Sequence, residues 1–110
     1  MYTHLARITV HEASEQDYAT LHDQMAKINF VRFIVDKDGR SHTLPDATYV
    51  CSSNETVEIL RDKIRKIIKQ TVPHSVAPLI IVVQYDHVAF DLPPDTSLRA
   101  LLKRLIDSNN

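Results

Sequence analysis

The chain opens with a segment in which apolar and polar positions alternate. Residues 2–11 place Ala6 and Ile8 on one side of an extended chain and Arg7 on the other. A period of two is typical of a half-buried β-strand. Further strands are predicted over residues 29–37, 48–52 and 79–85. The last of these is almost entirely apolar, which is typical of a central strand covered on both faces.

Two segments between these strands carry apolar residues at helical spacing. The first begins after Ser14, an N-cap residue with Asp17 in the position of a capping box. The second is capped by Ser53 or Asn54 and ends before Pro73. The two apolar stripes consist of Tyr18, Leu21, Met25 and Ile28, and of Val57, Leu60, Ile64, Ile67 and Ile68.

The predicted elements follow the order β-α-β-β-α-β, and a further helix follows Pro93 and Pro94. This order favours an α+β protein with the ferredoxin-like fold, in which two helices cover one face of an antiparallel four-stranded sheet. Another α+β arrangement of the same elements is the main alternative. We predict a ferredoxin-like domain over residues 1–92 and a C-terminal helical extension over residues 93–110. The extension is capped by Asp95 or Thr96, and its stripe consists of Leu98, Leu101, Leu102 and Leu105.

The composition is that of an ordinary globular domain. The 110 residues are 44% hydrophobic and 25% charged, and the net charge is −1. Such a balance excludes a bulk nucleic-acid coat protein, so any nucleic-acid binding would use a local patch. The single cysteine, Cys51, excludes an internal disulfide and the usual cysteine-rich zinc sites. No apolar run approaches the ~20 residues of a membrane helix, and we expect a cytoplasmic protein without membrane contact.

The sheet face that the helices leave uncovered is the first candidate for function. Arg7 and Arg32 would be neighbours there and could contact phosphate, or they could pair with Asp36 or Glu12. The many apolar residues of this face would exceed what a soluble monomer usually exposes. We therefore expect the C-terminal helix or a second copy of the chain, in a homodimer, to cover it. The predicted face consists of Leu5, Arg7, Thr9, Phe30, Arg32, Ile34, Thr48, Val50, Ile80, Val82 and Gln84.

Residues 21–65 carry a further signal. Their features are a helix ending at Met25, the run Ile28-Asn29-Phe30, Val35-Asp36, a turn at Asp38-Gly39, Leu44, and a serine-rich cap. In these features the stretch resembles the GhoS antitoxin family, small proteins with the fold of Cas-two-type endoribonucleases. The resemblance implies a metal-independent endoribonuclease that cleaves a toxin messenger RNA, needs no cofactor, and binds single-stranded or loop RNA in a dimer cleft.

Metal-independent cleavage of RNA needs groups that transfer protons and a cation that binds phosphate. Histidine suits proton transfer because its pKa lies near neutrality, so His11 and His22 are the candidate catalytic residues. The candidate RNA-binding residues are Arg7, Arg32, Arg40 and His42. No metal site is predicted, because no histidine pair has the spacing of a known ligand motif.

Two other function classes remain open. A non-catalytic protein-interaction module would use the open sheet face and the C-terminal helix, and its histidines would be incidental. A small-molecule regulatory domain of this fold is the third hypothesis, but the chain lacks the glycine-containing loop expected at its ligand site. A positive field around Arg7 and Arg32 would favour RNA, and an unbroken apolar face would favour protein packing.

Overall fold

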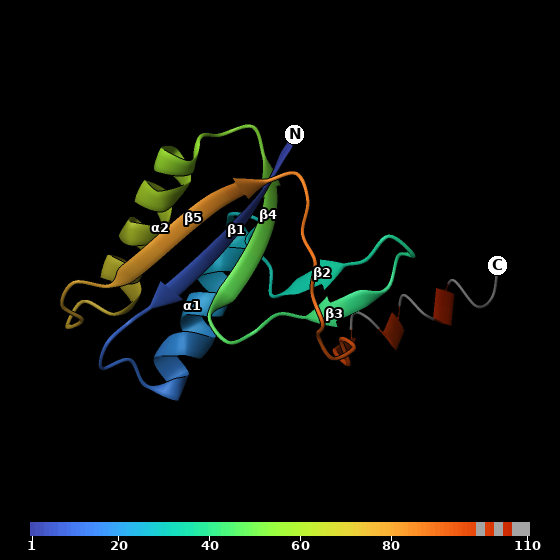
Figure 1. Ribbon diagram of the computed structural model, residues 1–110. Helices are drawn as coiled ribbons and strands as arrows, with labels where there is room; N and C mark the ends of the chain where they lie inside the picture. Colours follow the sequence, from blue (N-terminus) through green and yellow to red (C-terminus); the bar gives the residue numbers. More distant parts are fainter. Residues whose placement is uncertain (99–100, 103–104, 107–110) are drawn as a thin grey trace.

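The computed structural model describes residues 1–98, 101–102 and 105–106. A three-stranded antiparallel sheet has the order β4-β1-β5, and β2 and β3 form a separate hairpin. Figure 1 shows both helices on one side of the larger sheet and the hairpin beside β4. The elements are β1 (Tyr2–Thr9), α1 (Glu15–Lys27), β2 (Phe33–Val35), β3 (Ser41–Thr43), β4 (Thr48–Ser53), α2 (Val57–Thr71) and β5 (Leu79–Tyr85).

The α+β class is confirmed, and the arrangement is compatible with a ferredoxin-like fold, but the predicted four-stranded sheet is wrong. Residues 29–37, predicted as the second strand of that sheet, pair with β4 only at Val31, which exchanges two backbone hydrogen bonds of 2.9 Å with Val50. The segment then leaves β4 and pairs with β3. A local turn explains the change of partner, because the Asp36 side chain accepts hydrogen bonds from the backbone N–H groups of Asp38 and Arg40, each at 2.9 Å. Local hairpin closure thus replaces long-range pairing.

The main core lies between the larger sheet and the two helices. Along β1, Ala6 and Ile8 are buried there, as predicted from the alternation. The predicted uncovered face is wrong in residues 29–37 and in β5. Phe30 is fully buried in this core, and Ile80 and Val82 of β5 pack against it. The core consists of Ala6, Ile8, Val10, Leu21, Met25, Phe30, Tyr49, Cys51, Leu60, Ile64, Ile68 and Val72.

A second, smaller core covers part of the other sheet face. Residues 86–95, which we call the strap, leave β5 and run past β4 to the hairpin (Figure 1). The strap joins β3 through hydrogen bonds from Thr43 N to the Pro93 carbonyl and from Asp95 N to the Ser41 carbonyl, both 3.0 Å. This core consists of Ile34, Leu44 and Val50, with Leu5, Val31, Phe90 and Leu92 packed against it.

Strand β5 is an edge strand, so its predicted central position is wrong. It pairs only with β1 among the described strands, and the side chains that face away from the helices stay exposed. Leu79, Ile81 and Val83 are 58%, 58% and 40% exposed. Its continuous apolar sequence therefore reflects one buried face and one bare apolar face, instead of two covered faces.

The first helix cap is confirmed and the second is wrong. Ser14 and Asp17 form the expected capping box, with reciprocal hydrogen bonds of 3.0 Å. Helix α2 is capped by Thr56, whose hydroxyl accepts a hydrogen bond from Ile59 N, because Ser53 is still part of β4. The cap predicted for the C-terminal helix, Asp95 or Thr96, is wrong, because the first helical residue is Leu98 and Leu101 N donates to the Ser97 carbonyl. The Asp95 carboxylate accepts a hydrogen bond from Ser97 N in the turn before it, and part of the predicted helix lies outside the described residues.

Candidate functional site

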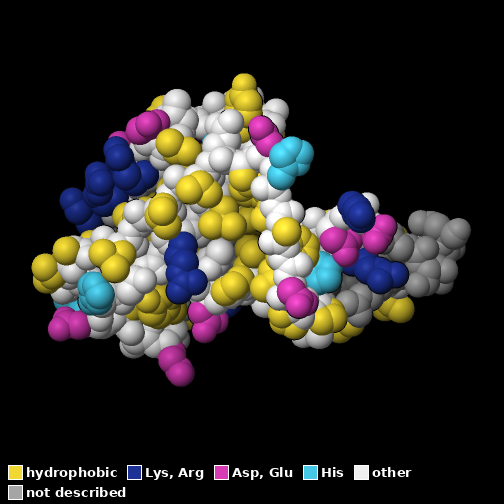
Figure 2. Space-filling view, in the orientation of Figure 1, with side chains coloured by type: hydrophobic (Ala, Val, Ile, Leu, Met, Phe, Trp, Pro, Cys, Tyr) yellow, Lys and Arg dark blue, Asp and Glu magenta, His cyan; other side chains and the backbone are white. Residues whose placement is uncertain are grey.

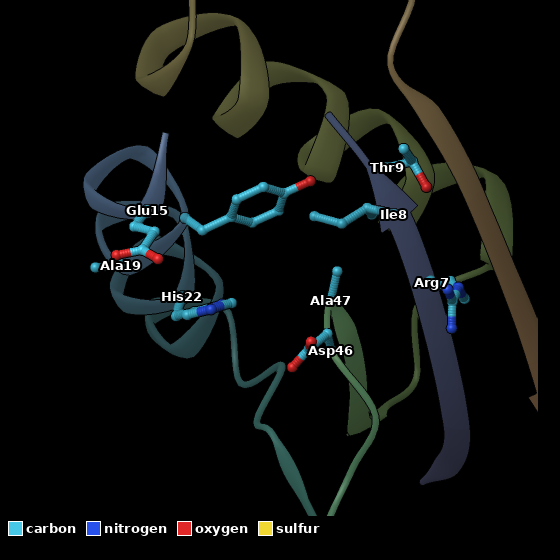
Figure 3. Close-up of a pocket in the computed structure, with 9 residues that line it drawn as sticks. Arg7, Ile8, Thr9, Glu15, Ala19, His22, Asp46 and Ala47 are labelled. Carbon is cyan, nitrogen blue, oxygen red and sulfur yellow. The ribbon is translucent and has the colours of Figure 1, made fainter. Parts of the chain in front are cut away.

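A pocket of about 490 Å³ lies between α1 and the end of β1. In Figure 3, Ile8 points from β1 toward α1, whereas Arg7 lies on the other side of the strand. His22, Glu15 and Asp46 bring an imidazole and two carboxylates to the pocket. The lining residues are Arg7, Ile8, Thr9, Glu15, Tyr18, Ala19, His22, Asp46 and Ala47.

His22 is held by a hydrogen bond that also satisfies a buried tyrosine. Its Nδ1 lies 2.6 Å from the hydroxyl oxygen of Tyr49, a core residue with no exposed surface. Burial raises the pKa of Tyr49 to about 12, so the hydroxyl stays protonated. The hydroxyl can therefore donate to Nδ1 of the neutral imidazole, and in that tautomer the ring proton is on Nε2.

The environment of His22 favours its neutral form. Burial lowers the pKa of His22 below its ordinary value of 6.5, and the positive charge of Arg32 lowers it further. The carboxylates of Asp23 and Asp46 act in the opposite direction but do not outweigh these two effects. At pH 7 His22 is therefore a neutral hydrogen-bond donor through Nε2.

Arg32, which the sequence indicated separately from His22, does not line the pocket, but its positive charge acts on His22. Arg32 is exposed, and its charge acts on both His22 and Tyr49. The expected neighbour of Arg32, Arg7, lies on the opposite face, opposite Ile81 of β5. The predicted pairing of the two arginines is wrong, because Val31 pairs with Val50 and thereby turns its neighbour Arg32 to the other face.

The other catalytic candidate is not part of this pocket. His11 is exposed in the turn after β1 and is not among the lining residues. The turn continues with Glu12, which has a positive φ of 63° and accepts a hydrogen bond of 3.2 Å from His74 through its carbonyl. The structure therefore does not assemble the two predicted histidines as an acid–base pair, and the role of His11 stays a prediction.

The remaining RNA-binding candidates lie on the hairpin. His42 is engaged within the fold, since its Nε2 lies 2.9 Å from the Asp36 carboxylate and its Nδ1 lies 3.2 Å from the Leu92 carbonyl. Hydrogen bonding to Asp36 raises the pKa of His42, and the same bond lowers the pKa of Asp36. Because both ring nitrogens face acceptors, the imidazolium form is the one that satisfies both. His42 thus fastens the strap to the hairpin, while Arg40 stays exposed at the turn.

Sequence analysis missed two residues that shape the interior. Tyr49, the partner of His22, could have been found, because strand alternation places it on the same face as Cys51. His4 is fully buried on β1, and neither of its ring nitrogens has a hydrogen-bond partner among the described residues. Its helix-side position follows from the alternation, but its lack of a partner does not.

Comparison of the sequence with known proteins found no matching family model and no significantly similar curated protein. Within the described ranges, no group of three or more His, Cys, Asp or Glu residues is arranged to hold a metal ion. No helix formed by the described residues is long and apolar enough to cross a membrane. The site is therefore interpreted from its own residues and from the resemblance over residues 21–65.

Proposed function

We propose that the protein binds RNA at the His22 pocket and acts on it as a small endoribonuclease of the kind that the GhoS-like resemblance implies. The observation that carries the proposal is the pocket itself, which brings His22 and Asp46 together, with the positive charge of Arg32 acting on His22. A guanidinium group binds phosphate oxygens strongly, and an imidazole next to it can transfer a proton. A transcript that encodes a toxin is the RNA target that the resemblance suggests.

The proposed reaction is attack of a ribose 2′-oxygen on the adjacent phosphorus. A new P–O bond closes a 2′,3′-cyclic phosphate while the bond to the 5′-oxygen breaks. Asp46 is the carboxylate that can accept the proton of the 2′-hydroxyl, and the imidazolium form of His22 donates a proton from Nε2 to the leaving 5′-oxygen. Arg32 stabilises the negative charge on the phosphate.

This assignment predicts an acidic pH optimum. The donor must be protonated, and the pKa of His22 is lowered, so the active fraction increases as the pH falls below 6.5. When His22 is protonated, the Tyr49 hydroxyl can rotate and accept a hydrogen bond from Nδ1. We therefore expect faster cleavage below pH 6.5 than above it.

The test is incubation of purified protein with end-labelled RNA of mixed sequence in EDTA, over a range of pH. We expect cleavage by the wild type and its loss in His22→Ala and Arg32→Ala. Arg61→Ala is the matched control, because Arg61 lies on α2, pairs with Asp62 and does not line the pocket, so its loss should leave cleavage unchanged. Intact RNA at every pH with a folded wild type would refute the enzyme. Equal loss in all three variants would refute this pocket as the site.

A second candidate function, a non-catalytic protein-interaction module, is supported by the bare apolar side of β5. Large aliphatic side chains in a row on an edge strand are uncommon on soluble monomers. Neither Ile81 nor Leu79 is covered by the strap, which packs over the β4 half of the face. RNA binding without a change in the RNA, together with stable self-association, would favour this candidate over the enzyme.

A further inference from the structure

The open sheet face is covered on one half only. The hairpin and the strap pack over the β4 half, where Val50 and Leu5 belong to the second core. The β5 half stays bare and consists of Leu79, Ile81 and Val83, which we call the bare face. Figure 2 looks onto this side of the molecule and shows hydrophobic side chains gathered over β5 and β1.

The same chain presents a second apolar surface after the strap, in residues 96–110, which we call the tail. The described residues of the tail are helical at positions 98, 101–102 and 105–106, and their side chains are exposed. In Figure 1 this part of the tail lies beyond the hairpin, on the side away from β5. The exposed fractions are 73% for Leu98, 44% for Leu101, 50% for Leu102, 61% for Leu105 and 64% for Ile106.

The start of the tail is anchored in this direction. Asp95 is 5% exposed, and its carboxylate accepts hydrogen bonds from the Ser41 hydroxyl at 3.0 Å and from Ser97 N at 2.9 Å. Its own backbone N–H donates to the Ser41 carbonyl. These bonds tie the first turn of the tail to β3. The described residues of the tail therefore extend away from the bare face of their own chain (Figure 1).

We infer that the apolar tail of one chain packs on the bare face of a second copy, and that the second copy returns the same contact. The inference is independent of the RNA proposal; it takes the interaction surface of the second candidate function and names its partner. In a two-fold dimer each tail covers the bare face of the other chain, so both apolar surfaces of each chain are covered. It also gives the sheet a helix on its second face, which is a common layered arrangement.

The surfaces are large enough for a stable contact. With about 100 Å² of apolar surface for each fully exposed large aliphatic side chain, the bare face and tail offer about 450 Å² per chain and about 900 Å² per pair. This apolar area is close to the ~1,000 Å² of a specific interface, and polar atoms around it would have to supply the remainder. Arg7 lies directly opposite Ile81 on the same sheet face and borders the bare face.

The first test is the mass of the full-length protein, measured by sedimentation equilibrium over a range of concentrations. We expect a dimer for the wild type. Ile81→Glu on the face and Leu102→Glu on the tail should each raise the dissociation constant by about 30-fold or more, the effect of losing an interface hot spot. Ile59→Glu on α2 is the matched control, since Ile59 is 46% exposed and lies on neither surface. A monomeric wild type would overturn the inference without bearing on RNA cleavage.

Mixing the two variants tests the exchange itself. The Ile81→Glu chain keeps its tail and the Leu102→Glu chain keeps its face, so an equal mixture should form dimers that neither variant forms alone. Dimers that survive Leu102→Glu would show that the faces meet directly, and dimers that survive Ile81→Glu would show that the tails meet. Either result would overturn the inference.

Cross-linking distinguishes exchange from folding of the tail onto its own chain. In a Cys51→Ala background, chains with Ile81→Cys and chains with Leu102→Cys should form a disulfide with each other on mixing. A chain that carries both substitutions should form linked dimers. A disulfide that forms within one chain, with a monomeric mass, would place the tail on its own face and refute the proposal.

Discussion

The buried imidazole of His4 offers a sharp test of how the core is built. His4 lies on the central strand with no exposed surface, and both ring nitrogens lack a hydrogen-bond partner among the described residues. A neutral imidazole still carries one N–H donor and one acceptor. Leaving such a group buried and unpaired costs about 1–3 kcal/mol. Leucine has nearly the same volume and no polar atom, so His4→Leu should remove this cost.

We expect His4→Leu to raise the free energy of unfolding by about 1–2 kcal/mol, after allowance for imperfect packing. For a chain of this length that corresponds to a rise of about 4–8 °C in Tm. Urea unfolding followed by circular dichroism, with thermal melts, measures both quantities. His87→Leu is the control, because His87 is exposed and its substitution should change stability by less than about 0.5 kcal/mol. A His4→Leu protein that is natively folded but no more stable would show that the ring nitrogens are satisfied in solution.

Three further outcomes follow from side chains already described. Ser14→Ala should lower the free energy of unfolding by about 1 kcal/mol in urea titrations, through loss of the capping box. Tyr49→Phe should lower the pKa of His22 further in an NMR titration, because the protonated ring loses the stronger hydrogen bond, from Nδ1 to the hydroxyl oxygen. The attachment of the strap should depend on pH in two directions. The pKa of His42 is raised above 6.5, so its contribution is complete below 6.5 and is lost as the pH rises through the raised value. The pKa of Asp36 is lowered below 3.8, so its contribution is present above 3.8 and is lost as the pH falls through the lowered value. Protection of the strap amides, measured as hydrogen exchange relative to the intrinsic rate at each pH, should therefore be greatest between these limits. His42→Gln should remove the decrease in protection at high pH.

The sequence predicts correctly which side chains of a strand are buried where apolar and polar positions alternate clearly. In β1, the side chains on one face include Ala6 and Ile8 and those on the other face include Arg7, so the buried face follows from the residue types alone. In residues 29–35 both faces of the strand carry apolar side chains, and a pattern with a period of two cannot show which face is buried. The single bridge between Val31 and Val50 decides the phase, and that contact depends on the tertiary fold.

The hairpin shows a second limit of sequence reasoning. Strand β3 is the polar run Ser41–Thr43, which has no apolar alternation and was expected to be loop. It is ordered by groups that are distant in sequence, since Pro93 and Asp95 bond to its backbone. The same contacts divide the open face into a covered half and a bare half. The bare face and its relation to the tail could therefore be found only from the coordinates.

The two proposals use opposite sides of the same sheet, and this separation makes them independently testable. His22 and Arg32 lie on the helix side, whereas Ile81 points to the other face. Substitution of Arg32 should therefore leave the mass of the protein unchanged, and Ile81→Glu should leave the pKa of His22 unchanged. If self-association changes RNA affinity, the cause must be the doubling of sites in one particle, because no residue of the pocket belongs to the bare face. A steeper dependence of RNA binding on protein concentration in the wild type than in Ile81→Glu would then be expected for long RNA and absent for short fragments that reach only one pocket.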